Sequence, residues 1–380
     1  MNNGLFFRLA CLFILTSCAP VISTDQSTGT QSRLGELVNS TATVTIRGEI
    51  TGKTIVDDSL SFVTDNANID PKYYDSPIPP VKITNNSFTV AATIREPQMR
   101  RIRLKSDSLR LYRRGVYFLD ASTSALTADY VAEECQQVNG ATAAEYRTQF
   151  LPFFAPTGTA VDCQQRSEDA LLWDTATRYD STLYAYVGAH PASYVALWHL
   201  IERFSQFGHT QVREQTLARF SQSMQASRLW QTLQADMRNA PIKQGAPFPM
   251  FLVKGVSQPE RLLQLPQAQY TLVDFWFSRC RPCLESFPAL KKLHATYQAK
   301  GFAIVGISTD RTPDVPIWQK RIKEYDLPWV QYLDENEVAA TRLGVHAFPT
   351  TFLLDRQGKV ILRDMTPAEL ETFLAANLGK

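Results

Sequence analysis

Apolar and polar residues alternate along the chain from about residue 41 to residue 123. Val44 and Ile46 begin the alternation, and residues 88–94 and 102–104 continue it with an apolar residue at every second position. A period of two is typical of strands that bury one face. The pattern therefore predicts an antiparallel β-domain over residues 41–123, in the form of a small sandwich.

The spacing of apolar residues changes to that of a helix between residues 124 and 240. The clearest apolar stripe at helical spacing runs through Tyr194, Leu197, Ile201 and Phe204. This period predicts a helical segment over residues 124–240. The proline-bounded stretch Pro241–Pro249 follows it and is interpreted as a linker between domains.

Short apolar runs alternate with helical patterns from residue 246 to residue 380. Residues 271–276 and 302–308 are nearly continuous apolar runs, which favours strands buried on both faces. Thr366 and Glu369 have the spacing of a capping box that opens a last helix. The predicted order β-α-β-α-β-β-α indicates an α/β domain, so the chain is expected to be multi-domain.

The first 40 residues lack the pattern of a folded core. Residues 1–17 combine one basic residue, a short apolar run and small residues, which is the shape of a secretory signal. The sequence Leu15-Thr16-Ser17-Cys18 resembles the lipobox of bacterial lipoproteins, which implies cleavage before Cys18 and its lipidation. Residues 18–40 are rich in Ser, Thr, Gln and Gly and are predicted to be a flexible tether.

The composition is that of a globular protein and gives little attraction for nucleic acid. Hydrophobic residues make up 44% of the chain and charged residues 20%, and the formal net charge is +2. This balance supplies no general positive field, so no nucleic-acid partner is expected. No cofactor and no metal site are expected either, because the histidines lack the spacing of metal ligands.

Six cysteines are present, and their positions are informative. Cleavage removes Cys11 and lipidation uses Cys18, which leaves two pairs of thiols. Cys135 and Cys163 are predicted to form a structural disulfide, since an envelope compartment is oxidising. A redox-active pair and two free buried thiols remain the alternatives.

The second pair, Cys280 and Cys283, encloses Arg-Pro in a CxxC motif where a strand gives way to a helix. Asp274 precedes Cys280 by six residues, Pro288 follows Cys283 by five, and Phe348-Pro349-Thr350 lies in a later loop. Together, these residues and their spacing resemble the sequence markers of proteins with the thioredoxin fold. The chain as a whole resembles the TlpA/ResA-like thiol–disulfide oxidoreductase lipoproteins that carry an N-terminal β-domain of unknown function.

The motif suggests roles for the residues around it. A helix N-terminus lowers the pKa of a thiol, so Cys280 is expected to be the exposed nucleophile and Cys283 the resolving thiol. Asp274 is expected to act as a general base for Cys283. The resemblance implies a cis-proline loop at Pro349. The residues expected to contact the substrate are Phe348, Trp276, Arg279, Arg281 and His346.

Two positions depart from the family pattern. Arg279 stands where the family usually has Trp, and Ser286 stands where members often have Glu. Arg279 and Arg281 flank the nucleophile, and two cations there should stabilise a thiolate and raise the reduction potential. The alternative is that both arginines point into water and act weakly.

The expected function is that of a membrane-tethered envelope thiol–disulfide oxidoreductase, a reductase or isomerase. Its expected partners are disulfide-bonded envelope proteins and a transmembrane electron donor of the inner membrane. Its expected location is the cell envelope of a Gram-negative-type bacterium, lipid-anchored and facing the periplasm. The substrate, the choice of membrane and the oligomeric state are left open by the sequence.

Other functions fit the sequence less well. The main alternative is a redox-silent binding lipoprotein whose β-domain holds a ligand. A thiol peroxidase would need Thr or Ser three residues before its reactive Cys and Pro seven before it, where Phe277 and Val273 stand. A copper chaperone would need a wider spacing of its cysteines.

Overall fold

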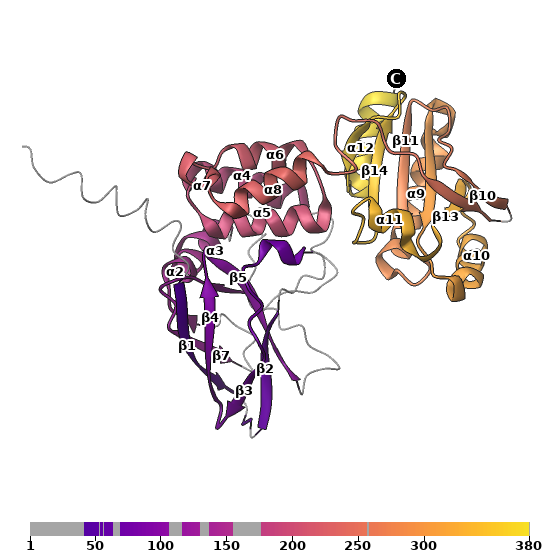
Figure 1. Cartoon of the computed structure of the whole chain (residues 1–380). Helices are drawn as coiled ribbons and strands as arrows, with labels where there is room; N and C mark the ends of the chain where they lie inside the picture. Colours follow the sequence, from indigo (N-terminus) through magenta and orange to yellow (C-terminus); the bar gives the residue numbers. More distant parts are fainter. Residues whose placement is uncertain are drawn as a thin grey trace, which may run out of the picture. The chain divides into compact units, whose positions relative to one another are not determined.

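A computed structural model describes residues 42–52, 54–55, 57–63, 69–105, 116–129, 137–154, 176–256 and 258–379 (Figure 1). The predictions for the signal, the tether, Cys18, Cys135 and Cys163 lie outside the described residues and stay predictions. Within the ranges given above, none of the helices has both the length and the apolar composition needed to cross a bilayer.

Eight strands in the N-terminal half form one sheet, with the order β6-β5-β2-β3-β4-β1-β7-β8. Its strands are β1 (Ala42–Thr51), β2 (Asp57–Val63), β3 (Val81–Thr84), β4 (Ser87–Ile94), β5 (Gln98–Leu104), β6 (Tyr117–Leu119), β7 (Ala125–Asp129) and β8 (Gln137–Val138). Strands β1 and β7 run parallel, whereas the other neighbours are antiparallel. The predicted β-domain is confirmed, and it is antiparallel except at the β1–β7 pair. The predicted sandwich is wrong for the described strands, which form one sheet, because alternation reports which face of a strand is buried and not how the strands are arranged.

Helices follow the sheet in the chain. They are α2 (Ala141–Glu145) and α3 (Leu151–Phe154), joined by a π-helical turn, then α4 (Ala176–Ala189), α5 (Tyr194–Phe207), α6 (Gln211–Ala218), α7 (Gln222–Gln225) and α8 (Arg228–Arg238). The expectation of helix from residue 124 is wrong for β7 and β8, which are too short to show a period. The helix predicted from the stripe at Tyr194 is confirmed, and Ser193 caps it by accepting from the N–H of Ala196 at 2.9 Å.

The strands and helices of this half share one hydrophobic core. Buried side chains from β1 to β8 and from α2 to α8 form a single cluster. Trp198 of α5 is buried, packs on Tyr74 in a tilted arrangement with 4.9 Å between ring centroids, and donates its indole N–H to the carbonyl of Pro97 at 2.6 Å. The helical layer therefore stabilises the sheet directly.

The C-terminal domain is a seven-stranded sheet with the order β10-β9-β13-β12-β11-β14-β15. Its strands are β9 (Leu252–Gly255), β10 (Gln258–Leu262), β11 (Tyr270–Trp276), β12 (Phe302–Ser308), β13 (Val330–Leu333), β14 (Thr350–Asp355) and β15 (Val360–Arg363). Its α-helices are α9 (Arg281–Tyr297), α10 (Val315–Glu324), α11 (Val338–Arg342) and α12 (Pro367–Leu378). Strands β11, β12 and β13 are parallel, so their carboxyl ends meet at one edge of the sheet.

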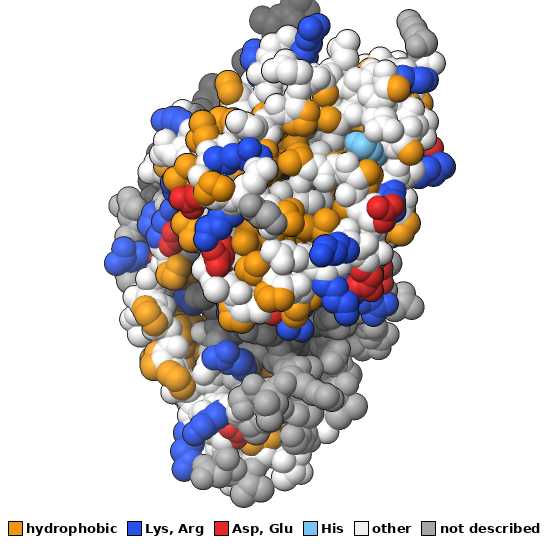
Figure 2. All heavy atoms as spheres, turned by 90° about the vertical axis from the view of Figure 1, so that its right-hand side faces the viewer, with side chains coloured by type: hydrophobic (Ala, Val, Ile, Leu, Met, Phe, Trp, Pro, Cys, Tyr) orange, Lys and Arg blue, Asp and Glu red, His pale blue; other side chains and the backbone are white. Residues whose placement is uncertain are grey.

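Large hydrophobic side chains remain more than a third exposed on part of this domain. Figure 2 shows hydrophobic side chains gathered across the middle of one face, with Lys and Arg around them. The exposed ones lie on or beside β9, β10, β13 and α11: Met250, Leu252, Val256, Leu262, Val330 and Val338. Among the described residues of this domain, exposed apolar surface is therefore concentrated near the β9–β10 edge.

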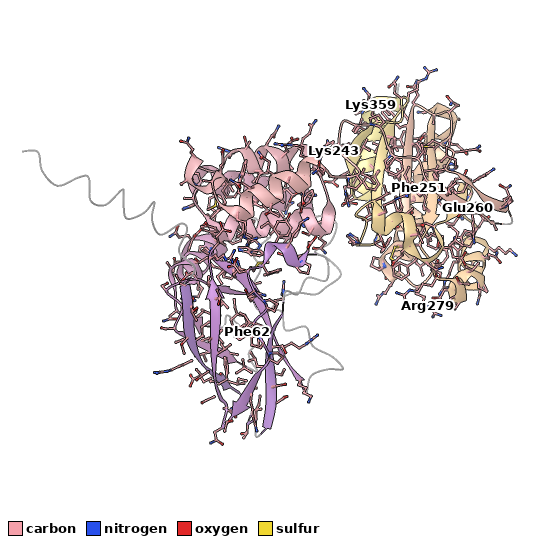
Figure 3. All side chains as sticks on the ribbon, in the orientation of Figure 1. Phe62, Lys243, Phe251, Glu260, Arg279 and Lys359 are labelled. Carbon is pink, nitrogen blue, oxygen red and sulfur yellow. A yellow bond between two sulfur atoms is a disulfide. The ribbon has the colours of Figure 1, made fainter. Side chains whose placement is uncertain are left out.

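The two faces of the C-terminal sheet pack against different layers. On β11, Leu272 and Trp276 join the cluster that includes α9, α10 and α12, whereas Val273 and Phe275 join the cluster that includes α11. Phe251, which Figure 3 labels in this domain, is buried in the second cluster. The alternation along β11 therefore decides which side chains point toward α9.

The stretch interpreted as a linker is partly built into this domain. Ile242 and Phe248 are buried in the second cluster. The N–H groups of Gly245 and Phe248 donate to the carbonyls of Val360 at 2.7 Å and Gly358 at 2.8 Å. The segment Pro241–Pro249 is therefore not a free connection, because its apolar residues find a place beside β15.

Asp180 of α4 holds two arginines inside the N-terminal half. It accepts from Arg203 at 2.9 Å and pairs with Arg213 at 2.7 Å. Burial alone would raise the pKa of Asp180, but the two guanidinium groups outweigh burial and hold that pKa below its ordinary value.

Replacing Asp180 by Ala should destabilise the N-terminal half by about 3–5 kcal/mol, because Arg213 would stay buried without a counter-charge. Urea denaturation followed by tryptophan fluorescence measures the change. Glu214→Ala, which removes an exposed partner of His209, is the control and should have little effect. Equal losses in both variants would contradict the prediction.

Candidate active site

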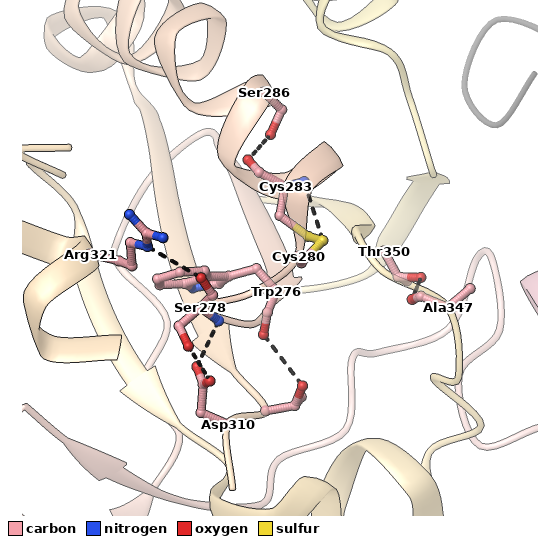
Figure 4. The surroundings of a disulfide bond; sticks show 10 residues. Trp276, Ser278, Cys280, Cys283, Ser286, Asp310, Arg321, Ala347 and Thr350 are labelled. Atoms are coloured by element: carbon pink, nitrogen blue, oxygen red, sulfur yellow. Dashed lines mark hydrogen bonds between the residues drawn. A yellow bond between two sulfur atoms is a disulfide. The ribbon is translucent and has the colours of Figure 1, made fainter. Parts of the chain in front are cut away.

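Cys280 and Cys283 form a disulfide where β11 gives way to α9 (Figure 4). Cys280 is the N-cap residue of α9, and its Sγ accepts from the N–H of Cys283 at 3.2 Å. Pro282 lies in the first turn, where its missing N–H costs nothing. The helix N-terminus thus directs an N–H donor at the sulfur, which is the arrangement that stabilises a thiolate.

Both sulfurs are buried in this oxidised form. Cys280 is 3% exposed and Cys283 is fully buried, within the cluster that includes α9. Phe277 and Phe348 pack against this cluster, edge to face, with 5.5 Å between their ring centroids. The expected exposure of Cys280 is therefore wrong for the disulfide state, because its side chain is buried in an apolar cluster. Its role as the nucleophile stays a prediction.

Asp274 lies on β11, on the face that carries Leu272 and Trp276 and packs against α9. It is 1% exposed, and neither carboxylate oxygen has a hydrogen-bond partner among the described residues. Burial raises the pKa of Asp274 to about 7. A carboxyl with this pKa can both accept and release a proton near neutral pH.

The loop before β14 contains the expected cis bond. The peptide bond between Phe348 and Pro349 is cis. Thr350 opens β14, pairs with Phe275 of β11, and donates its hydroxyl to the carbonyl of Ala347 at 2.7 Å (Figure 4). Phe348 and Pro349 are half-buried and His346 is exposed, so this loop offers both apolar and polar surface.

Trp276 does not contact the surface. It is fully buried, donates its indole N–H to Gln331 at 3.1 Å, and packs edge to face on Phe287 at 5.1 Å between centroids. The prediction that Trp276 contacts the substrate is therefore wrong. Its side chain follows Asp274 at a spacing of two on β11, which places it on the covered face.

The two arginines beside the cysteines form ion pairs. Arg279 bonds Asp314 at 2.9 Å and Arg281 bonds Glu285 at 2.7 Å, and the two arginine side chains are 63% and 78% exposed. Figure 3 labels Arg279 at the edge of the domain. Each carboxylate offsets the charge of its arginine, and water screens the rest. This geometry favours the alternative in which both arginines act weakly on the sulfur.

Two further residues beside the motif, Asp310 and Ser278, were not predicted from the sequence. Asp310 follows β12 and accepts from both the N–H and the hydroxyl of Ser278, which precedes the CxxC motif (Figure 4). The sequence signal that could have identified Asp310 is its position just after the buried parallel strand β12, because functional side chains gather at the carboxyl ends of such strands.

A pocket lies away from the cysteines. It has a volume of about 250 Å³ and is lined by residues of the β9–β10 hairpin, the end of β13 and α11, with Leu252, Lys254 and Val338 among them. Neither cysteine lines it. The described residues also hold no group of His, Cys, Asp and Glu side chains able to bind a metal ion.

Comparison with known proteins gives consistent matches for part of the chain. Residues 244–363 match the model of the AhpC/TSA family. The chain is 29% identical over 133 residues to the thiol-disulfide oxidoreductase ResA of Bacillus thuringiensis subsp. konkukian, covering 34% of this chain and 76% of that protein. It is 29% identical over 142 residues to the thioredoxin-like protein YneN of Bacillus subtilis, covering 35% and 79%.

Solved structures match a similar share of the chain. A putative thiol:disulfide interchange protein DsbE from Chlorobium tepidum is 30% identical with a TM-score of 0.33, covering 36% of this chain and 99% of that one. The thioredoxin domain of a thiol-disulfide oxidoreductase from Bacteroides vulgatus is 28% identical with a TM-score of 0.33, covering 36% and 97%.

Asp274→Asn should change how the stability of the oxidised protein depends on pH. The folded pKa of about 7 lies above the ordinary value of 3.8. The stabilising contribution of the neutral carboxyl is therefore complete below the unfolded pKa and is lost as pH rises through 7. At pH 8 the free energy of unfolding of the variant should exceed that of the wild type by at most about 4 kcal/mol. Near pH 4 the two free energies should match. Urea denaturation at both pH values tests this, and a variant less stable at pH 8 would contradict it.

Replacing Arg279 or Arg281 by Gln should leave the reduction potential of the cysteine pair within about 15 mV of the wild type, because each charge is already paired at the surface. Equilibration with dithiothreitol buffers measures the potential. A fall of about 30 mV or more in either variant would show that the arginines do stabilise the thiolate.

Proposed function

We propose that this chain, which is a thiol–disulfide oxidoreductase with a TlpA/ResA-like thioredoxin fold, exchanges disulfides through Cys280 and Cys283. We further propose that it acts in the cell envelope as a membrane-tethered reductase or isomerase. The observation that carries the exchange is the position of Cys280. Its sulfur caps α9, is bonded to Cys283, and lies in the layer that covers the buried Asp274.

The reduced enzyme begins the reaction with the Cys280 thiolate. The thiolate attacks one sulfur of a substrate disulfide, the substrate S–S bond breaks, and one substrate sulfur leaves as a thiolate. A mixed disulfide now joins Cys280 to the substrate. The N–H of Cys283 and the positive end of α9 stabilise the thiolate before the attack.

The second step releases the substrate. The Asp274 carboxylate takes the proton of the Cys283 thiol, and the Cys283 thiolate attacks the Cys280 sulfur. The mixed disulfide breaks, the second substrate sulfur leaves as a thiolate, and Cys280–Cys283 is the product disulfide. Two electrons have then passed to the substrate. In the isomerase reaction a substrate thiol resolves the mixed disulfide instead, with no net electron transfer.

The loop at Pro349 is the proposed place where the substrate chain lies. Pro349 has no N–H, so it cannot donate to a neighbouring strand. Phe348 supplies an apolar surface beside the cysteine cluster, and His346 supplies an exposed polar group. This surface suits an extended peptide on either side of a disulfide.

A peroxidase reaction is not proposed, although the matching family model covers this domain. Three residues before Cys280 stands Phe277, and seven before it stands Val273, which is buried in the core. Neither side chain offers a hydroxyl to a peroxide.

The N-terminal sequence and the redox chemistry bear on where the protein acts and with which partners. The lipobox at Cys18 supports a lipid anchor, and the polar segment after it supports a tether that holds the domain at the membrane. A reductase in an oxidising compartment needs electrons, so we propose a transmembrane electron donor of the inner membrane. Disulfide-bonded envelope proteins are the proposed substrates, and Cys135–Cys163 is the proposed structural disulfide.

Cys283→Ala should trap substrates as mixed disulfides on Cys280, because the resolving thiol is absent. Cys280→Ala is the matched control and should trap none. The test incubates the reduced variants with a disulfide-bonded model protein, and non-reducing electrophoresis with peptide mass spectrometry reads the linkage. Trapping by neither variant, with both folded, would overturn the exchange mechanism.

The reduction potential of the wild-type pair decides the direction of the reaction. A value near −250 mV or below supports a reductase fed by an electron donor, whereas a value near −120 mV would make the protein an oxidant or isomerase. Thiol alkylation in glutathione or dithiothreitol buffers, read by mass spectrometry, gives this potential and follows Cys135 and Cys163 separately.

A further inference from the structure

Asp310 lies just after β12 and is 4% exposed. Its Oδ1 accepts from the Ser278 hydroxyl at 2.6 Å. Its Oδ2 accepts from the Ser278 N–H at 2.9 Å and from the Ser308 hydroxyl at 2.6 Å. These three bonds join the ends of β11 and β12, which are parallel neighbours.

Ser278 belongs to the short loop that leads from β11 into α9. Only Arg279 separates it from Cys280. Both Ser278 and Ser308 are fully buried, so their hydroxyl groups depend on Asp310 for a partner. The same loop is fixed twice more, since Thr309 donates to the carbonyl of Trp276 at 2.9 Å and Cys280 donates to that of Phe277 at 3.0 Å.

Asp310 differs from Asp274, another buried carboxylate of this domain. Asp274 has no hydrogen-bond partner among the described residues, whereas Asp310 has three donors. Asp310 forms no ion pair with any residue in the described part of the chain, so its bonds serve the loop rather than a cation. The backbone carbonyl of Ser278 accepts a further hydrogen bond, from Arg321 Nε at 3.4 Å (Figure 4).

We propose that Asp310 is a positioning residue that sets the reactivity of Cys280 by holding Ser278. The inference rests on the proposed exchange through Cys280. The bond from the Cys283 N–H to the Cys280 sulfur forms only if the loop delivers that sulfur to the end of α9. Asp310 fixes the loop two residues earlier and therefore fixes the sulfur.

Loss of this anchor should make the Cys280 thiolate less stable. The stabilisation by a helix N-terminus falls off within the first turn, so a sulfur that moves away from the N–H groups loses part of it. Asp310→Ala should slow alkylation of Cys280 at pH 7 by about threefold or more, which corresponds to a rise of about half a pKa unit.

The experiment measures the alkylation rate of Cys280 against pH in the reduced full-length mature protein, with iodoacetamide and peptide mass spectrometry. Asp310→Ala and Ser278→Ala should both move the pH profile upward. Ser278→Ala removes one hydroxyl and serves if Asp310→Ala does not fold. Asp310→Asn keeps an oxygen for the Ser278 N–H and gains an amide group that can donate to the Ser278 hydroxyl. Because both links to the loop can persist, this variant should stay within about twofold of the wild type.

Asp334→Ala is the structural control. Asp334 is also buried at the end of a parallel strand, but its carboxylate caps α11 through the N–H groups of Ala339 and Ala340 at 2.9 and 2.7 Å. The control should lose stability and keep the wild-type pH profile of Cys280.

Two results would overturn the proposal. One is a wild-type profile in both folded Ser278→Ala and folded Asp310→Ala, or in Ser278→Ala alone where Asp310→Ala does not fold. The other is a shift in Asp310→Asn as large as in Asp310→Ala, which would assign the effect to charge rather than to position. A separate measurement on the wild type tests the proposed function. If the wild-type cysteine pair fails to exchange with dithiothreitol, the exchange mechanism itself is overturned, whatever the variants show.

Discussion

The hydrogen bond from the Cys283 N–H to the Cys280 sulfur is the constraint around which the C-terminal domain is organised. The first N–H groups of any helix lack partners within the helix and need an acceptor when they are buried. Here the acceptor is the sulfur of Cys280, the proposed nucleophile. The strand before it, the loop of Ser278 and the proline in the first turn all place this sulfur at the start of α9. The helix cap and the proposed reactive group are therefore the same atom.

Two buried carboxylates of the C-terminal domain show how surroundings give the same side chain different roles. Asp274 lies on β11 and Asp310 lies just after its parallel neighbour β12. Asp274 lies among apolar side chains without a donor, so burial favours its neutral form, which suits the proton transfer proposed for it. Asp310 is surrounded by hydroxyl and N–H donors and holds the loop. The number of donors, rather than depth of burial, separates the two roles.

Features that depend on residues close in sequence could be predicted. The strand before the CxxC motif, the helix after it and the capping box of Thr366 and Glu369 follow from spacing, and the structure contains both bonds of that box. The cis bond at Pro349 followed from the family resemblance. Trp276 was misplaced because an aromatic residue at a strand end suits either a surface or a core. Strands β9, β10 and β13, of four or five residues each, were missed. The equally short β15 was predicted because a turn at Asp355–Gly358 joins it to β14.

Pairings between distant residues could not be predicted, and they change the electrostatics of the site. Arg279 and Arg281 are the most conspicuous charges in the motif, yet Asp314 and Glu285 pair with them at the surface. Ser278 looks unremarkable in sequence, yet it meets a carboxylate 32 residues away. Which carboxylate meets which loop depends on β11 lying beside β12, and local spacing does not contain that order. A paired surface charge is screened by water, whereas a buried hydrogen bond is not. The reactivity of Cys280 should therefore depend more on the buried bonds of its loop than on the arginines beside it.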